Sequence, residues 1–278
     1  MNILFYGNCQ CACLYNILNL QPPFKSKILM VHESYNINKK DFDKLISEAN
    51  IIITQPISDN YKDKYYLSSK YLIENKNPNS IIIIFPSLHF DFYYIDLQYI
   101  KLKEVIIDKP SAYHYKYMRE YIDTNKSAEN YINNIVNNEF LITKEELLLT
   151  ANNSIDELKR RENEVIEKYK NVNNVHIIIA SEFIKNNFYK QLLFYSMNHP
   201  TKYMLHFIMN EIIKLCKFDS KIHKDINYNL DPLNQDRCII YKCIQPICKF
   251  NIYEKGFMLT NTINNIVDIY NEYKKYYN

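Results

Sequence analysis

The stretch that decides the fold of this chain is Tyr6-Gly7-Asn8-Cys9-Gln10. The apolar run at residues 3–5 precedes it and predicts a strand, while residues 12–18 follow with apolar positions along one helical face. We therefore expect a tight turn from strand to helix. The whole chain contains only 2 Gly, and a Gly at such a turn permits a positive φ and the close approach of a backbone or ligand.

Cys9 is the candidate nucleophile of this turn. We expect it at a helix N-terminus, where unpaired N–H groups and the positive end of the helix dipole favour a thiolate. The thiolate is the form of cysteine that attacks in covalent catalysis. The alternative is that Cys9 is a small buried hydrophobic residue, as most free cysteines are.

Length and composition limit the class of protein. With 278 residues and 47% hydrophobic content, the chain can bury a large core, which is enough for one large domain or two small ones. We expect a single α/β domain over residues 1–278 with a helical insertion at about 111–170. A net charge of +3 with scattered Lys residues lacks the basic stripe of a nucleic-acid-binding protein. The high Lys, Asn, Ile and Tyr content is typical of an AT-rich genome, so the 26 Tyr are not interpreted as a stacking surface.

The 7 cysteines favour a reducing compartment. Their number is odd, they form no regular framework, and no signal peptide precedes them, so we expect a cytoplasmic protein. No apolar run approaches the roughly 20 residues of a membrane span. No metal is expected, because the regularly spaced cysteines contain no C-x-x-C pattern: Cys9, Cys11, Cys13, Cys238, Cys243 and Cys248.

Strands and helices alternate through the first hundred residues. Strands are predicted at residues 3–5, 27–31, 50–54 and 80–85, with a fifth at 175–179, and helices at 41–48 and 63–74. Continuous Ile runs without alternation are typical of parallel strands covered on both faces. The pattern predicts an open, doubly wound α/β sheet, which binds ligands beyond the carboxyl ends of its strands.

Polar residues follow three of these strands. They are the 7–10 turn after the first strand, Gln55-Pro56-Ile57 after the third, and Pro86-Ser87-Leu88-His89 after the fourth. Because the carboxyl ends of parallel strands share one edge of the sheet, we expect a site there.

Helices dominate the rest of the chain. They are predicted at residues 116–123, 127–137, 143–170, 182–195, 202–216 and 261–276. Thr143-x-x-Glu146 is a capping-box pattern at the start of the long helix, and Asn152-Asn153-Ser154 is expected to break that helix in two. The helical insertion at about 111–170 is a candidate for covering the pocket or for an interface in a homo-oligomer.

Two histidines compete as the general base. His199 precedes Pro200, which favours an extended residue before it and a helical turn after it, so His199 would stand at a helix entrance. His89 follows the fourth strand at the ligand-binding edge. Local geometry favours His199, and His89 stays open as the alternative.

Four motifs in this order resemble the WcbI family of capsule polysaccharide-biosynthesis acetyltransferases: Gly7-Asn8-Cys9-Gln10, Thr54-Gln55-Pro56-Ile57, Phe85-Pro86 and Asn198-His199-Pro200-Thr201. The resemblance covers residue 1 to about 217. It implies a variant of the SGNH-hydrolase fold, an open flavodoxin-like parallel sheet of about five strands with a large helical insertion and a helical C-terminal part. It also implies acetyl transfer from acetyl-coenzyme A to a sugar hydroxyl.

Carried over by position, the resemblance implies Cys9 as nucleophile or acyl-handling residue and His199 as its base. SGNH hydrolases place an Asp three residues before the His, whereas this chain has Ser196, so a Cys–His dyad is expected. The residues expected to serve the oxyanion or the substrate are Gly7, Asn8, Gln10, Gln55 and Asn198.

The implied donor is acetyl-coenzyme A, used as a substrate. Its phosphates need basic partners, for which Lys202 and Lys190 beside the His199 motif are candidates. Two alternatives stay open. The same site with water as acceptor would be an esterase or thioesterase, and a chain that keeps only the pocket would be a non-catalytic binding module.

Overall fold

The computed structural model describes residues 1–18, 20, 22–102, 105–124, 126–218, 226–235, 237–252 and 263–277. The chain divides into two compact units. Unit 1 comprises Met1–Leu88, Asp156–Ile184 and Pro200–Pro232, and unit 2 comprises His89–Ile155, Lys185–His199 and Leu233–Asn278. The single domain predicted from the sequence stays a prediction.

Unit 1 is built on a five-stranded sheet with the strand order β2-β1-β3-β4-β9, in which all neighbours are parallel. The strands are β1 (Asn2–Gly7), β2 (Lys25–Met30), β3 (Ile51–Thr54), β4 (Ile81–Ile84) and β9 (Val175–Ile177). The predicted open parallel α/β sheet is confirmed. The chain places β2 on one side of β1 and then crosses over to place β3 on the other side. The carboxyl ends of β1 and β3 therefore flank the switch point, where such sheets bind ligands.

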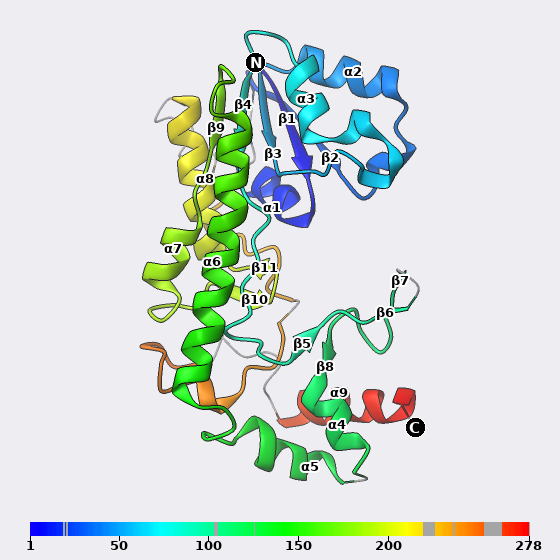
Figure 1. Cartoon of the computed structure of the whole chain (residues 1–278), viewed down its shortest axis with the longest axis vertical. Helices are drawn as coiled ribbons and strands as arrows, with labels where there is room; N and C mark the ends of the chain where they lie inside the picture. Colours follow the sequence, from blue (N-terminus) through cyan, green and yellow to red (C-terminus); the bar gives the residue numbers. More distant parts are fainter. Residues whose placement is uncertain are drawn as a thin grey trace. The chain divides into compact units, whose positions relative to one another are not determined.

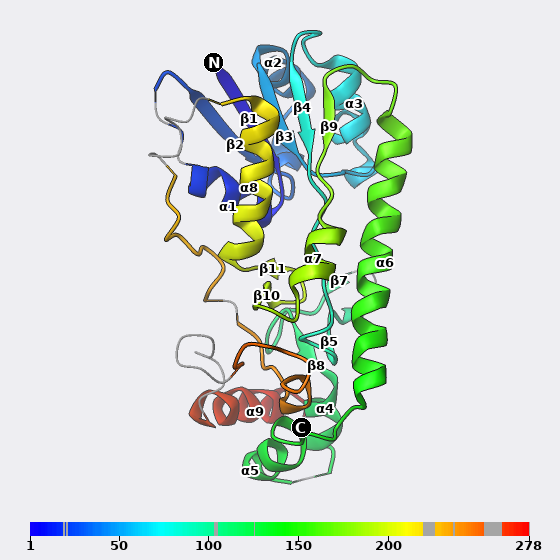
Figure 2. The ribbon, with the colours of Figure 1, turned by 90° about the vertical axis from the view of Figure 1, so that its left-hand side faces the viewer.

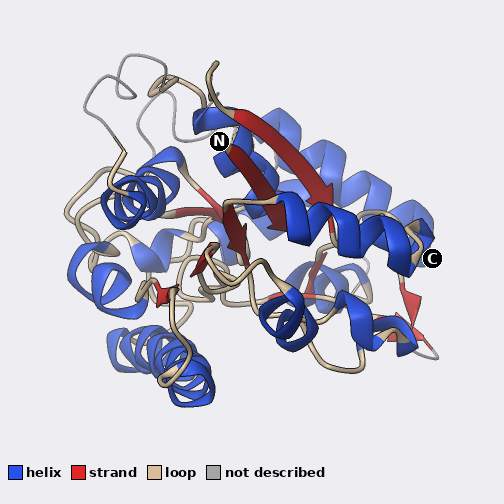
Figure 3. Ribbon diagram, turned by 90° about the horizontal axis from the view of Figure 1, so that it is seen from above, coloured by secondary structure: helices blue, strands red, loops and turns tan. Residues whose placement is uncertain are grey.

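Helices cover both faces of this sheet (Figures 2 and 3). One face carries α1 (Cys9–Leu18) and α8 (Lys202–Cys216), and the other carries α2 (Lys39–Glu48) and α3 (Ser69–Asn75). Alternate strand residues such as Leu4, Ile52 and Ile82 pack in one buried cluster with Phe42 of α2 and Leu72 of α3. Burial on both faces explains why the strands are apolar throughout rather than alternating.

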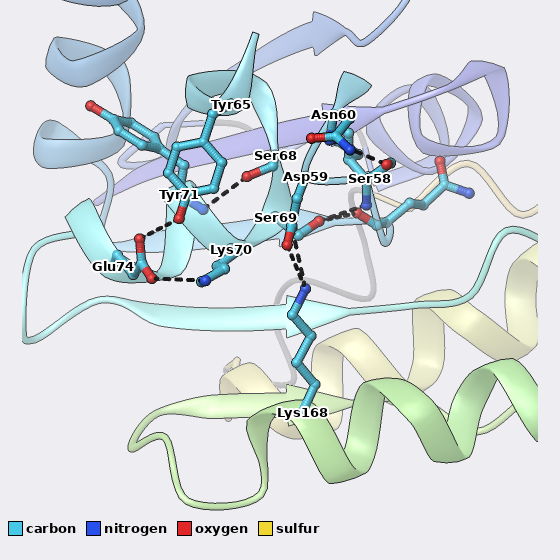
Figure 4. A network of polar contacts seen from close by, with 12 residues as sticks. Ser58, Asp59, Asn60, Tyr65, Ser68, Ser69, Lys70, Tyr71, Glu74 and Lys168 are labelled. Carbon is cyan, nitrogen blue, oxygen red and sulfur yellow. Dashed lines mark hydrogen bonds and ion pairs between the residues drawn. The ribbon is translucent and has the colours of Figure 1, made fainter. Parts of the chain in front are cut away.

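The helix predicted at residues 63–74 is wrong in its first half. Two short 3-10 turns, Tyr61–Asp63 and Tyr65–Leu67, occupy that stretch, and α3 begins only at Ser69. The side chain of Ser68 accepts a hydrogen bond from the backbone N–H of Tyr71 (3.0 Å) (Figure 4). This N-cap fixes the helix start.

The helix α6 (Lys144–Tyr169) is continuous over 26 residues, so the break predicted at residues 152–154 is wrong (Figure 1). Its residues 144–155 belong to unit 2 and its residues 156–169 to unit 1. The side-chain hydroxyl of Ser154 donates a hydrogen bond to the Asp91 carboxylate (3.0 Å). The predicted capping box is confirmed, since Thr143 Oγ1 accepts from Glu146 N at 3.2 Å and Thr143 N donates to the Glu146 carboxylate at 3.0 Å.

Unit 2 combines short strand pairs with helices (Figure 1). The pairs are β5 (Leu97–Gln98) with β8 (His114–Tyr115), β6 (Lys101–Leu102) with β7 (Val105–Ile106), and β10 (Phe194–Ser196) with β11 (His199–Pro200), whose Pro200 belongs to unit 1. The helices are α4 (Lys116–Ile122), α5 (Ala128–Tyr131), which continues into a π-helical turn over Ile132–Val136, and α9 (Ile263–Tyr277). The helices predicted here are confirmed, although residues 261–262 of the last lie outside the described residues.

The helix predicted at residues 182–195 is half wrong. Helix α7 (Ser181–Asn187) ends early, and the chain continues into β10. Residues 192–197 are all buried, which a helix with one covered face does not allow. The remaining short helical turns of the described chain lie at Ser34–Asn36 and Lys242–Ile244. Among the described helices, none has the length and apolar composition of a membrane-spanning segment.

Candidate active site

The turn after β1 lies at the switch point of the unit 1 sheet. β1 ends at Gly7 and α1 begins at Cys9. A Cβ atom on Gly7 would stand 2.6 Å from Gln55 Oε1 and 2.7 Å from Cys11 Cβ. Glycine is therefore required here by close packing, which is one of the two reasons expected from the sequence.

Asn8 caps the helix that carries Cys9. Its side-chain oxygen accepts from the backbone N–H of Gln10 (2.9 Å), and its carbonyl oxygen accepts from Cys11 N (3.0 Å) and Ala12 N (3.2 Å). Asparagine is among the preferred N-cap residues because its side chain satisfies an otherwise unpaired N–H group. This cap fixes Cys9 as the first residue of α1.

Gln10 and Gln55 join the loops that follow β1, β3 and β4. The Gln55 side chain accepts from Asn8 N (2.9 Å) and donates to Gln10 Oε1 (3.0 Å). Gln10 also accepts from Leu88 N (3.0 Å) and donates to Leu88 O (2.9 Å). Both amides are almost fully buried, with 1% and 2% exposure. These contacts tie the three loops together at the carboxyl edge of the sheet. That the two glutamines stabilise an oxyanion stays a prediction.

The loop after β3 is held by further contacts (Figure 4). Ser69 Oγ donates to the Gln55 carbonyl (3.0 Å) and accepts from Ile57 N (2.7 Å). Lys168 of α6 contacts the Asp59 carboxylate at 3.2 Å. Unit 1 therefore presents a fixed rim at the edge where Cys9 lies.

The loops after β3 and β4 border a cavity of about 260 Å³ in unit 1, whose lining residues do not include Cys9. Pro56 and Ser87 line it from the loops after β3 and β4, and α6 contributes Leu158 and Arg161. Glu162 also lines it, but its carboxylate accepts from Ala180 N (2.7 Å), Ser181 N (3.1 Å) and Ser181 Oγ (2.5 Å). The Glu162 carboxylate therefore caps the N-terminus of α7.

Cys9 differs from its neighbours in accessibility. Cys11 and Cys13 are buried, and burial raises the pKa of the Cys11 thiol far above its usual value. Cys9 and Cys216 are the partly exposed cysteines, and burial raises the pKa of Cys216 to about 12. Position at the start of α1 together with partial exposure distinguishes Cys9, since a helix N-terminus stabilises a thiolate.

His199 is held by Tyr113 within unit 2. The Tyr113 hydroxyl donates to Asn198 Oδ1 at 2.6 Å and lies 3.2 Å from His199 Nε2, with the two rings perpendicular at 5.7 Å between centroids. Asn198 Nδ2 donates to the Tyr99 hydroxyl at 2.9 Å. Nothing in the sequence singled out Tyr113 among the 26 Tyr.

The contacts of Tyr113 indicate one tautomer of His199. A phenol has one proton, and the carbonyl oxygen of Asn198 only accepts, so we assign the Tyr113 proton to the shorter contact. With that assignment, His199 Nε2 donates to Tyr113. Burial raises the pKa of Tyr113 well above its usual value, so the phenol stays neutral.

His199 lies in a short strand just before the helix that the sequence predicted at residues 202–216. His199 and Pro200 form β11, and α8 starts two residues later at Lys202. The extended conformation expected before a proline is present. Ser196, at the position of the missing Asp, is buried, and its hydroxyl donates to Asn198 Oδ1 at 3.3 Å.

His89 has a carboxylate partner, Asp91, which the sequence analysis did not consider. His89 Nε2 lies 2.7 Å from Asp91 Oδ1, and Asp91 accepts from the Ser154 hydroxyl at 3.0 Å. Both His89 and Asp91 side chains are about two-fifths exposed, at 37% and 41%. His89 therefore stays the alternative base.

The predicted coenzyme lysines lie in different units. Lys202 opens α8 in unit 1, with its Nζ 5.8 Å from the ring centroid of Tyr203. Lys190 is exposed in unit 2, with its Nζ 5.4 Å from the ring centroid of Tyr189. Cys9 and His199 are likewise divided between units 1 and 2. Both the lysine contacts and the Cys–His pairing stay predictions.

The chain is thus an open parallel α/β protein of the class that binds ligands at the switch point of its sheet, and Cys9 lies at that point as the first residue of α1. The chain belongs to the family of the polysaccharide biosynthesis enzyme WcbI, whose family model matches residues 2–221.

A solved structure shares the fold. It is described as WcbI, a novel polysaccharide biosynthesis enzyme, in its native form without a disulfide bond between coenzyme A and a cysteine. The two chains are 18% identical, with a TM-score of 0.74 and coverage of 99% of this chain and 90% of that chain. A comparison with curated proteins found no match.

Proposed function

We propose that the protein is an acetyltransferase that moves an acetyl group from acetyl-coenzyme A to a sugar hydroxyl in polysaccharide biosynthesis. The observation that carries the proposal is Cys9, a partly exposed thiol at the capped start of α1 beside the sheet's switch point. Membership of the WcbI family supports the polysaccharide context. The coenzyme A and cysteine named for the solved relative support the donor.

In the acyl-enzyme route, the Cys9 thiolate attacks the thioester carbonyl of acetyl-coenzyme A. The carbonyl oxygen gains the charge, and collapse of the intermediate expels the coenzyme thiolate and leaves the acetyl group on Cys9. The sugar hydroxyl then attacks this thioester while His199 takes its proton, and the Cys9 thiolate returns. A thioester exchanged onto a thiol keeps its reactivity, so the enzyme remains a good donor.

Direct transfer is the second route within the same function. His199 would take the proton of the sugar hydroxyl while that oxygen attacks acetyl-coenzyme A, and Cys9 would shape the site. The contact of the Tyr113 hydroxyl with His199 Nε2, which holds the imidazole ring in place, supports His199 as the base in either route. Lys202 and Lys190 are the proposed partners of the coenzyme phosphates.

Compartment and assembly belong to the same proposal. We infer a cytoplasmic protein, supported by seven cysteines that form no disulfide in the structure. A homo-oligomer that uses the helices of residues 111–170 is part of the proposal, with pocket coverage by those helices as its alternative.

The test is release of free thiol from acetyl-coenzyme A with and without a sugar acceptor. The proposal predicts slow release alone, faster release with sugar, and an O-acetylated product. Fast release that ignores sugar would establish a thioesterase instead, and no turnover with intact coenzyme binding would establish a binding module. Cys9→Ala should remove the turnover, and Cys216→Ala, a partly exposed cysteine on α8, is the matched control.

A further inference from the structure

Unit 2 contains a cavity of about 340 Å³ to which the proposed acetyl transfer has assigned no role so far. Four chain segments form it: the loop before β8, β8 itself, residues 237–238 and α9. Its volume falls in the range of small-molecule sites, which start at about 300 Å³. The residues that matter for its chemistry are Tyr113, Tyr115, Arg237, Asp268, Glu272 and Tyr273.

Aromatic rings with fixed positions form part of the wall. Tyr273 donates to the Tyr113 carbonyl (2.7 Å) and accepts from Tyr115 N (3.1 Å), while the Tyr115 hydroxyl accepts from Ile239 N (3.1 Å). Tyr115 and Tyr273 are buried, with ring centroids 5.9 Å apart. These two rings hold the wall in place, and the partly buried ring of Tyr113 lines the cavity beside them. The negative face of an exposed aromatic ring attracts the weakly positive C–H groups of a sugar ring.

Charged groups of both signs stand around these rings. Asp268 and Glu272 lie one turn apart on α9 and therefore share a face. Arg237 comes from another segment, and its guanidinium is held 4.6 Å from the ring centroid of Tyr195 while Nε donates to Asn234 O (2.8 Å). Carboxylates accept from hydroxyl groups and a guanidinium donates to them, so the set suits a ligand with many hydroxyls.

The charges of the lining favour a neutral ligand over the coenzyme. The cavity carries two carboxylates, Asp268 and Glu272, against one guanidinium, Arg237. Nearby carboxylates repel the phosphates of coenzyme A, whereas a neutral polyhydroxylated ligand meets no such repulsion.

Tyr113 connects this cavity to the proposed base. It lines the cavity, and its hydroxyl lies 3.2 Å from His199 Nε2 within the same unit. We propose that the cavity binds the acceptor of the reaction, a neutral sugar residue of the polysaccharide. This assignment rests on the proposed acetyl transfer and names the acceptor site within it.

Saturation-transfer NMR on the full-length protein tests the site without coenzyme. The probes are the methyl glycosides of glucose, mannose, galactose and N-acetylglucosamine, with glucuronic acid as the anionic comparison. We expect saturation of at least one neutral glycoside and a weaker signal from glucuronic acid. Absence of saturation for all four neutral glycosides would overturn the proposal.

Variants locate the bound sugar. Asp268→Asn with Glu272→Gln, and separately Arg237→Gln, should weaken the bound glycoside by about tenfold or more, because each removes hydrogen bonds to a charged group. Glu120→Gln, an exposed carboxylate on α4 of the same unit, is the matched control and should bind as wild type does. Equal binding by all variants, with folding verified by circular dichroism, would place the sugar elsewhere.

Coenzyme A binding, measured in parallel on the wild-type protein, separates the two proposals. Coenzyme binding without glycoside binding overturns the sugar site and leaves acetyl transfer standing. Glycoside binding at this cavity without any coenzyme binding overturns acetyl transfer, and the cavity then stands as a sugar-binding site.

Discussion

Cys9 and Cys11 are two residues apart, but we expect opposite effects when each is replaced by alanine. Cys9→Ala should abolish acetyl transfer and leave the free energy of unfolding nearly unchanged, because Cys9 is partly exposed at the turn. Cys11 is 0% exposed beneath β3, so Cys11→Ala should cost about 1 to 2 kcal/mol through the cavity it leaves. Urea unfolding and thiol release measure the two effects. Loss of activity in Cys11→Ala with normal activity in Cys9→Ala would reverse the assignment.

Tyr113 is the residue that most directly positions His199. Tyr113→Phe removes the acceptor of the Nε2 proton, so we expect acetyl transfer to fall about tenfold to a hundredfold, within the range of a general base contribution. Tyr66→Phe is the control, because it removes a Tyr hydroxyl that donates to Ile37 O in unit 1 (2.9 Å).

Nitrogen-15 NMR reports the tautomer of His199 directly. A Tyr113 that only stabilised the fold would not change this tautomer when replaced. The wild-type protein should show His199 in the Nε2–H tautomer, and Tyr113→Phe should shift it toward a mixture. A wild-type ring protonated on Nδ1 would contradict the contacts inferred for Tyr113.

Among the elements, those with a covered stripe or a continuous apolar run were predictable from sequence. The strands β1, β3 and β4 are confirmed because burial on both faces leaves a continuous apolar run, and the 202–216 helix is confirmed because one buried stripe leaves a helical period. The 3-10 turns before α3 were missed because the Ser68 cap leaves no such pattern. The strand β10 was missed because its buried residues follow α7 in the chain and continue its apolar sequence.

The same limit applies to the site. Cys9 and its glycine turn follow from local sequence alone. Partners brought together by tertiary structure do not: Tyr113 reaches His199 across 86 residues, and Gln55 reaches Gln10 across 45. His89 received its Asp91 partner from a neighbour two residues away, a signal that the sequence did contain.

Asp96, buried in unit 2, makes the free energy of unfolding depend on pH. Burial raises its pKa from 3.8 to about 6, although Tyr241 OH (2.6 Å) and Tyr117 N (3.1 Å) donate to its carboxylate. A raised folded-state pKa means that the folded protein binds the proton more tightly than the unfolded chain does. This contribution to stability is complete below about pH 4 and is lost as the pH rises through about 6.

Asp96→Asn should remove that dependence. Wild-type protein should lose on the order of 3 kcal/mol from this group between about pH 4 and pH 7, and the variant should lack that component of the slope. Urea unfolding across this pH range measures it. A variant whose pH slope equals that of wild type would show that Asp96 is not the group responsible.

At the scale of the whole molecule, the account requires Cys9 of unit 1 and His199 of unit 2 to act together. A crystal structure should place their side chains within one hydrogen bond or one bridging water. A separation well beyond about 8 Å, which exceeds a water-bridged pair, would contradict the dyad and favour His89.

We propose that this protein uses coenzyme A as its acyl carrier. Calorimetric titration of the full-length protein with coenzyme A and acetyl-coenzyme A tests it most directly, because it needs no knowledge of the acceptor sugar. The account predicts saturable binding of both ligands below millimolar concentration. Absence of detectable heat at millimolar concentrations of either ligand would contradict it.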